Sequence, residues 1–152
     1  MLFEIASNEL KFENQKKEII ETKAERFVSF GGTLFTIISA FFFIYLENLI
    51  NKVYMIFLLG SSLFLLASIL FSIISLKTYK YSSIDIRKLI IKCHDWKSDD
   101  FVKHYTGNLV EAIESRRDIN IKKSKALKKS IILFFISLLF LIIAILLFIL
   151  NL

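Results

Sequence analysis

The chain has 152 residues, of which 55% are hydrophobic, and it contains no proline. A chain so apolar and so short cannot bury its hydrophobic residues in one soluble core, which excludes most soluble classes and favours a multi-pass membrane protein. The formal net charge is +6, and the single cysteine, Cys93, excludes an internal disulfide and any metal site built on paired cysteines.

Residues 1–26 are rich in charge, with acidic and basic side chains in nearly equal number. Apolar residues such as Leu10, Ile19 and Ala24 recur among them in a ragged helical stripe. The pattern predicts an amphipathic cytoplasmic helix that either lies on the membrane or packs on a partner helix. A solvated extension of the segment that follows is the alternative interpretation.

Residues 27–76 contain two uncharged stretches, 27–46 and 53–76, joined by a short polar connection. Each is about as long as the roughly 20 residues that cross a bilayer as a helix, so the pair predicts a two-span helical hairpin. Both stretches carry small residues at spacings that place them on one helix face, where they let helices approach closely in lipid. These residues are Gly32, Thr36 and Ala40 in the first stretch and Ser61, Ser68 and Ser75 in the second.

Residues 77–129 are strongly basic, with 14 Lys and Arg against 7 Asp and Glu. The positive-inside rule places this module in the cytoplasm, and because two spans precede it, the N-terminus is predicted there too. Ser83 is suited to cap one helix, and Ser98, followed by two aspartates, to cap a second. Nothing clearly stops the second helix after Gly107, so we expect it to run unbroken into the membrane; a kink at Asn120 and the serines that follow is the alternative.

Residues 130–152 form the third predicted transmembrane helix, since Ile131–Leu150 holds no charge, glycine or proline. Lysines crowd the approach to it, as expected where a helix enters from the cytoplasm beside anionic lipid. The predicted fold is therefore an all-α membrane protein with three transmembrane helices, N-terminus inside and C-terminus outside. An amphipathic helix precedes the spans, and a helical insert separates the second from the third. The lysines are Lys122, Lys123, Lys125, Lys128 and Lys129.

Serine spacing is the most regular feature of the uncharged stretches. Ser130 and Ser137 repeat at seven, as the serines of the second span do, and seven residues are nearly two helical turns. Each set therefore lies on one face of its helix. One interpretation is helix–helix packing through small residues; the other is a mildly polar face that lines a pore in an oligomer.

The chain shows no pattern typical of an enzyme, a cofactor site or a metal site. Its two histidines, His94 and His104, stand ten residues apart without a matching set of carboxylates. Arg87 and His94 have the Arg-x6-His spacing of some HEPN ribonucleases, which keeps ribonuclease activity as an alternative. We expect no enzymatic activity, no cofactor and no direct binding of nucleic acid.

A set of basic residues in the 77–129 module is a candidate site for an anion or a nucleotide. Guanidinium and ammonium groups bind phosphates, and Trp96 or Tyr105 nearby offers a surface on which a base stacks. Attraction to anionic lipid is the alternative role of the same charges. The candidate residues are Arg87, Lys88, Lys92, Arg116 and Arg117.

The order of these parts resembles that of the transmembrane effectors of bacterial Pycsar anti-phage systems and the related SLATT-type membrane effectors. The first span follows Glu21-Thr22-Lys23-Ala24, an acidic-x-Lys-Ala motif in which the family has Asp in place of Glu21. The last span follows Asn120-Ile121-Lys122-Lys123-Ser124-Lys125, which loosely matches the family's Asn or Ser followed by Lys. The resemblance covers nearly the whole chain by layout but only these short segments by motif.

The resemblance implies an effector that a nucleotide second messenger, made by a partner cyclase during infection, switches on. The activated chains then assemble as a homo-oligomer and compromise the bacterial inner membrane. A soluble defence partner is the other implied activator. The alternative function, of a different class, is a non-catalytic membrane scaffold that recruits a soluble partner through its cytoplasmic helices.

Overall fold

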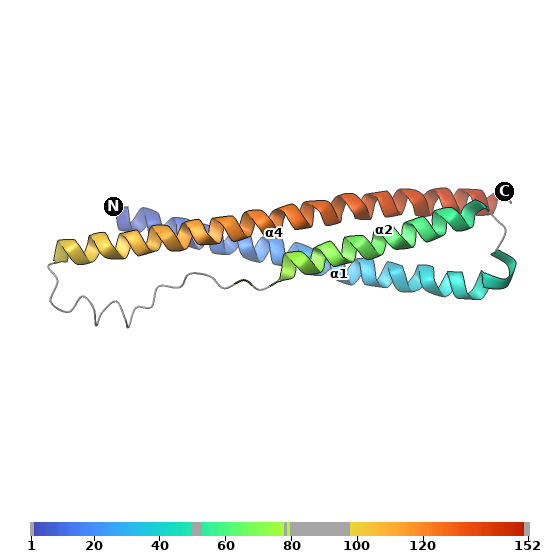
Figure 1. Cartoon of the computed structure of the whole chain (residues 1–152), viewed down its shortest axis with the longest axis horizontal. Coiled ribbons are helices and arrows are strands. Elements are labelled where there is room, and N and C mark those ends of the chain that lie inside the picture. The colour runs from blue at the N-terminus through green and yellow to red at the C-terminus, as the bar shows by residue number, and fades with distance from the viewer. Residues whose placement is uncertain (1, 50–52, 78, 80–97, 151–152) are drawn as a thin grey trace. The chain divides into compact units, whose positions relative to one another are not determined.

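The structure is a computed structural model and describes residues 2–49, 53–77, 79 and 98–150. Within these ranges the chain forms three helices and no strand, which confirms the all-helical prediction. The helices are α1 (Leu2–Leu49), α2 (Val53–Leu76) and α4 (Ser98–Ile149) (Figure 1). The helix predicted to follow Ser83 lies outside the described residues.

Both α1 and α4 are longer than a membrane span and run without a break from a charged part into an apolar part. The amphipathic helix predicted at 1–26 and the span predicted at 27–46 are therefore two parts of one helix. The prediction of an unbroken helix from Ser98 is confirmed. The absence of proline explains both, because no residue removes a helical hydrogen bond, and the glycines of these helices weaken them without stopping them.

The chain divides into two compact units. The charged unit consists of Met1–Ile20 and Thr78–Lys122, and the apolar unit consists of Glu21–Lys77 and Lys123–Leu152. In the charged unit the first turns of α1 lie beside α4, and Ala6, Leu109 and Ile113 form its small core. Contacts between the two helices join residues about 107 apart in sequence at successive turns, so the helices are parallel.

In the apolar unit α2 runs antiparallel to α4. Ser61 contacts Ser137, and seven residues further along α2, Ser68 contacts Ser130, seven residues earlier in α4. Phenylalanines of α1 and α4 also meet edge to face across this unit, as Phe27 does with Phe134. The core also contains Ile38, Tyr54, Met55, Leu58, Leu65 and Ala144.

Burial along α4 follows a heptad pattern. Successive inward residues alternate in steps of three and four, the spacing with which two long helices keep one face in contact. The helix α4 therefore packs on its neighbours in the manner of a coiled coil rather than through a few isolated contacts. The buried residues in this pattern include Leu109, Ile113, Asn120, Lys123, Leu127, Ser130, Phe134, Ser137 and Ala144.

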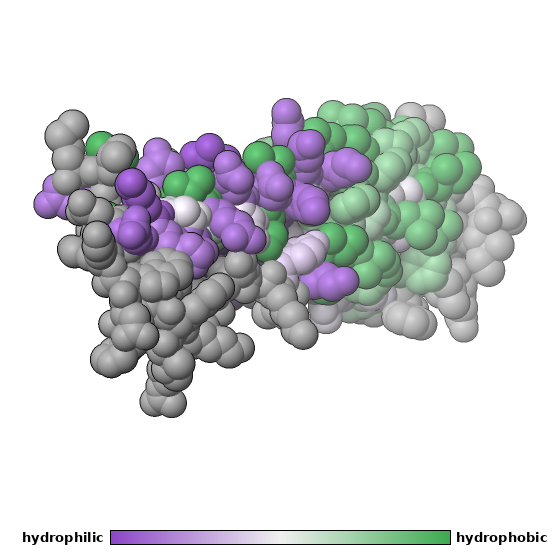
Figure 2. Space-filling view, turned by 60° about the vertical axis from the view of Figure 1, so that its left-hand side comes forward, coloured by the Kyte–Doolittle hydropathy of each residue, from purple (hydrophilic) through white to green (hydrophobic). Residues whose placement is uncertain are grey.

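Among the residues that the structure describes, two helical segments are long and apolar enough to cross a membrane, namely α2 and the Val102–Ile149 part of α4. Large apolar side chains cover their outer surfaces; Ile56 and Leu63 are about 70% exposed. On the face seen in Figure 2, hydrophobic residues gather over the apolar parts of the helices and hydrophilic residues over the charged parts. A surface of this kind is suited to lipid.

Substitutions of two glycines in the apolar unit are expected to have different effects on stability. A Cβ atom added to Gly60 would lie 2.8 Å from Cδ1 of Phe140, whereas a Cβ added to Gly32 would meet nothing within 4 Å. We therefore expect Gly60→Ala to destabilise the unit by about 1–3 kcal/mol through overpacking. Gly32→Ala is expected to leave stability unchanged or to raise it by up to about 1 kcal/mol through helix propensity. Thermal unfolding in detergent measures both, and equal effects of the two substitutions would contradict the close α2–α4 contact.

Candidate functional site

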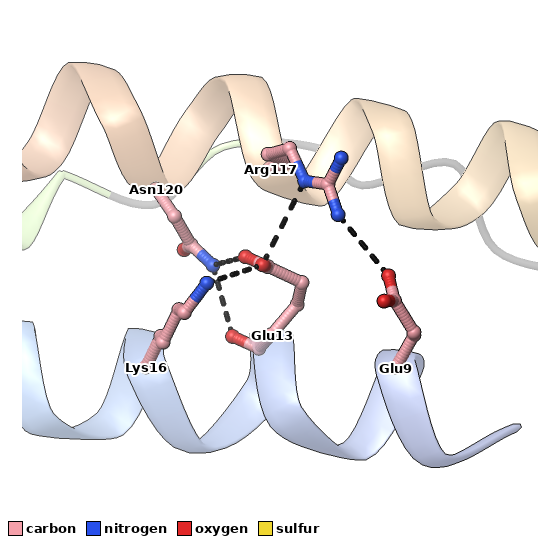
Figure 3. Close-up of polar contacts among 5 residues, drawn as sticks. All are labelled: Glu9, Glu13, Lys16, Arg117 and Asn120. Carbon is pink, nitrogen blue, oxygen red and sulfur yellow. Dashed lines mark hydrogen bonds and ion pairs between the residues drawn. The ribbon is translucent and has the colours of Figure 1, made fainter. Parts of the chain in front are cut away.

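The charged unit contains a buried polar layer formed by Glu13 of α1 and Asn120 of α4 (Figure 3). Glu13 is only 1% exposed and Asn120 only 5%. The Asn120 side-chain amide donates to the Glu13 backbone carbonyl at 2.9 Å and to the Glu13 carboxylate at 2.8 Å. Lys16 donates to the other carboxylate oxygen at 2.8 Å, and Arg117 lies 3.9 Å from that oxygen. The carboxylate is thus bound from both helices.

The pKa of Glu13 is set by two opposed effects. Burial of the carboxyl group disfavours its charged form and raises the pKa. The hydrogen bonds from Lys16 and Asn120, with the positive charges of Lys16 and Arg117, outweigh that effect, so the pKa lies below the ordinary value of 4.5. Glu13 is therefore ionised at neutral pH, and its ionised form stabilises the folded state.

This pKa predicts a loss of stability in acid. Because the folded-state pKa of Glu13 lies below 4.5, the stabilisation is complete above that pH and decreases as the pH falls through the folded-state pKa. Other carboxylates titrate in the same range, so the readout is a difference: the melting temperature of Glu13→Gln should fall less between pH 7 and pH 4 than that of the natural chain. Equal falls would contradict a lowered pKa.

The apolar unit contains a second polar contact, between Lys123 of α4 and Glu21 of α1. Each of these residues is the first of its segment in this unit. The Lys123 ammonium donates a hydrogen bond to the Glu21 carboxylate, and the Lys123 side chain is only 1% exposed. Ser75 of α2 donates to the Lys123 backbone carbonyl at 3.1 Å. Lys123 therefore joins all three helices. Ala24, one turn after Glu21, is fully buried and lets the helices approach.

Serine hydroxyls connect α2 to α4 through the apolar unit. Ser61 donates to the Ser137 carbonyl at 2.9 Å, and Ser137 donates to the Ser61 carbonyl at the same distance. Ser68 donates to the Ser130 carbonyl at 2.8 Å, and the Ser72 hydroxyl lies 2.6 Å from the Ser130 hydroxyl. All five serines, like Ser75, are buried. The structure thus places Ser61, Ser68, Ser75 and Ser137 in the contact between two helices of one chain.

The candidate small face of the first stretch lies elsewhere. Thr36 and Ala40 are exposed, and the Thr36 hydroxyl bonds back to the Gly32 carbonyl at 3.0 Å. The glycine that α1 buries against α2 is Gly31, whose added Cβ would lie 3.0 Å from Cγ1 of Ile69. Gly32, Thr36 and Ala40 are therefore not brought together with the serines.

Two of the five candidate anion-binding residues contact α1 in the charged unit. Arg116 donates a hydrogen bond to Asn14, and Arg117 donates to Glu9 at 3.1 Å. The Arg117 side chain is about half exposed. Both guanidinium groups thus have partners within the chain. Arg87, Lys88 and Lys92 lie outside the described residues.

Sequence reasoning missed the importance of Glu13, Glu21, Asn120 and Lys123 as buried side chains. In the sequence, Glu13 is one of the balanced charges of residues 1–26, and Lys123 is one of five lysines expected beside anionic lipid. The available signal was the heptad position, because Lys123 stands seven residues before Ser130 on the same inward face. Its neighbours Lys122, Lys125, Lys128 and Lys129 are exposed, as predicted for a basic collar.

No protein-family model, curated protein or solved structure matches the chain. Over the part of the chain that the structure describes, no three His, Cys, Asp or Glu side chains gather as metal ligands would. The candidate functional site therefore consists of the two polar contacts between α1 and α4 and the serines between α2 and α4.

Proposed function

We propose that the chain is a three-span protein of the bacterial inner membrane, with its N-terminus and residues 77–129 in the cytoplasm. The uncharged parts of α1, α2 and α4 are the spans. The excess of basic residues in 77–129 supports this orientation. The parallel course of α1 and α4 also supports it, because each helix enters its apolar part from a charged part.

In this proposal the protein is a membrane-perturbing effector of an anti-phage defence system, activated by a nucleotide signal or a partner and acting as a homo-oligomer. The observation that carries it is the contact between Glu21 and Lys123. These residues belong to the two short segments on which the resemblance to the Pycsar and SLATT-type effectors rests. The two segments contact each other between α1 and α4, beside the fully buried Ala24. This contact supports a shared architecture rather than a chance similarity of short motifs.

The chemistry of the apolar unit is compatible with switching. Serine–serine hydrogen bonds between membrane helices contribute only about 0.6 kcal/mol each on average, so they can exchange partners at small cost. In the charged unit, an anionic ligand that binds Arg117 competes with Glu9 for the guanidinium, in a contact between two half-exposed side chains. Such contacts are individually weak, and a phosphate competes with them readily.

The test is membrane potential and propidium uptake in bacteria that express the chain, with and without phage infection and its genomic neighbours. We expect depolarisation only when the system is triggered. Glu21→Asp, which installs the family residue, is the matched variant that should keep activity. Intact membranes under every condition, together with co-purification of one stoichiometric soluble protein, would reject the effector and favour the scaffold.

A further inference from the structure

The face of α1 that points away from α4 carries an unusual stripe. In the charged unit, Ile5, Phe12 and Ile19 are 52%, 56% and 53% exposed, at intervals of seven residues. Single exposed apolar residues are ordinary, but three at heptad spacing on a charged helix align on one side of it. Asn8 and Gln15, also exposed, stand between them in steps of three and four.

The same spacing continues along α1 into its apolar part, where the residues become small. Every residue in this register from Ile5 to Ala40 is exposed, so α1 has a second heptad face opposite the one it packs inside the chain. Small residues on a membrane helix are typical of a close helix–helix contact. We call this face the outer seam; it consists of Ile5, Asn8, Phe12, Gln15, Ile19, Thr22, Arg26, Ser29, Thr33, Thr36 and Ala40.

Two shallow, open depressions lie on the outer seam. The first, of about 320 Å³, is lined by Ile5, Asn8, Glu9 and Phe12. The second, of about 620 Å³, is lined by six residues that include Thr22, Glu25, Arg26 and Ser29. In a coiled coil, each inward side chain inserts into a hole formed by four residues of the facing helix at this spacing. The seam thus presents holes as well as side chains that would fill them.

We infer that the outer seam binds the α1 helix of a second copy of this chain, with the two helices parallel. This inference rests on the proposed function for the parallel direction, because copies inserted into one membrane share their orientation. The partner has to complement two successive parts of α1. The first part is charged and carries an apolar stripe, and the second part is apolar and carries small residues. The outer seam of a second α1 has that pattern at the same positions.

Charge pairing supports the α1–α1 contact around Ile19. Glu18 precedes Ile19, and in a parallel coiled coil it faces the residue five positions further along the partner, which is Lys23. Two such pairs form, one in each direction. Arg26 meets the depression that Glu25 and Arg26 of the second copy line together, where Glu25 offsets the like charge of the two arginines. Two like-charged approaches occur in the same register, Glu4 to Glu9 and Lys11 to Lys16. Both are weakened within each chain, because Glu9 lies 3.1 Å from Arg117 and Lys16 lies 2.8 Å from Glu13.

The described part of α4 offers no comparable face in the charged unit. Its large exposed apolar residues there are Val102, Val110 and Ile121, which are not separated by seven. Spacings of eight and eleven residues do not place these side chains in the seam of a left-handed coiled coil, which requires a seven-residue repeat. The second copy of α1 is therefore the better occupant.

Cysteine crosslinking in isolated membranes tests the inference on the full chain. In a Cys93→Ser background, single substitutions Phe12→Cys and Ile19→Cys are expected to give disulfide-linked dimers on mild oxidation. Asn14→Cys, exposed on the same helix but off the seam, is the matched control and should give several-fold less dimer. Thr33→Cys extends the test into the apolar part, where dimers are again expected. Equal yields at Asn14 and Phe12, or no dimer at Phe12 and Ile19, would overturn the inference.

The same variants separate this interface from the proposed function. Crosslinked dimers in cells whose membranes stay intact would keep the α1–α1 contact and reject the effector. Triggered depolarisation without crosslinking at the seam would reject the contact and keep the effector. The two readouts are independent, because crosslinking requires no activation.

Discussion

Glu21→Ala is expected to lower the free energy of unfolding in detergent by about 3 kcal/mol, because the substitution removes the carboxylate that faces the buried ammonium of Lys123. Breaking a buried ion pair from one side typically costs about 3–5 kcal/mol. We expect the lower end of that range, since the Glu21 side chain is 26% exposed and water can partly replace it. Thermal and denaturant unfolding followed by circular dichroism measure the loss.

The matched control for this prediction is Glu25→Ala, which removes an exposed acid one turn away and should change stability by less than about 0.5 kcal/mol. The double variant Glu21→Leu with Lys123→Met should recover most of the loss, because replacing both charges by apolar groups leaves no buried charge. If Glu21→Ala and Glu25→Ala prove equivalent, Lys123 does not depend on Glu21.

Asn120→Leu is expected to destabilise the pairing of α1 with α4 in the charged unit by about 2 kcal/mol. It removes two hydrogen bonds from Glu13 and leaves a buried carboxylate with fewer donors, each such loss costing about 1–3 kcal/mol. The effect should be local. Amide hydrogen exchange should accelerate in residues 98–122 while α2 keeps its protection.

Two further substitutions sharpen this result. Asn120→Asp places a second carboxylate beside Glu13 and should be more harmful than Asn120→Leu at neutral pH, with partial recovery on acidification. Ile121→Leu alters the exposed neighbour and serves as the control for a change of side chain at this turn. Unchanged exchange in Asn120→Leu would show that the polar layer does not hold the two helices together.

Much of the fold could be predicted from the sequence, because apolar length and heptad spacing are properties of local segments. The second span was predicted at 53–76, the bounds that α2 has, and the run of α4 from Ser98 followed from the absence of a stop signal. Serine spacing indicated which faces would lie inward. These inferences need no knowledge of what a segment packs against.

The candidate site was harder to predict because it depends on partners distant in sequence. A lysine among five lysines is normally solvated, and the meeting of Glu21 with Lys123, 102 residues away, makes its burial tolerable. The same holds for Glu13, whose nearest donors include an asparagine 107 residues later. Composition gives no sign of which charge in a run turns inward.

The seven-residue period of the serines has a consequence for how the helices are aligned. If α4 slides by one heptad along α2, Ser68 reaches Ser137 and Ser75 reaches Ser130, so two hydroxyl contacts form again in the new alignment. The serine interface therefore permits more than one register, with the alternatives one heptad apart. The contacts of Glu13 with Asn120 and of Glu21 with Lys123 have no copy one heptad away, and they alone among these polar contacts select a single alignment. An agent that loosens those two contacts would free α4 to move by whole heptads, with two of the four serine contacts between α2 and α4 formed again in the new alignment.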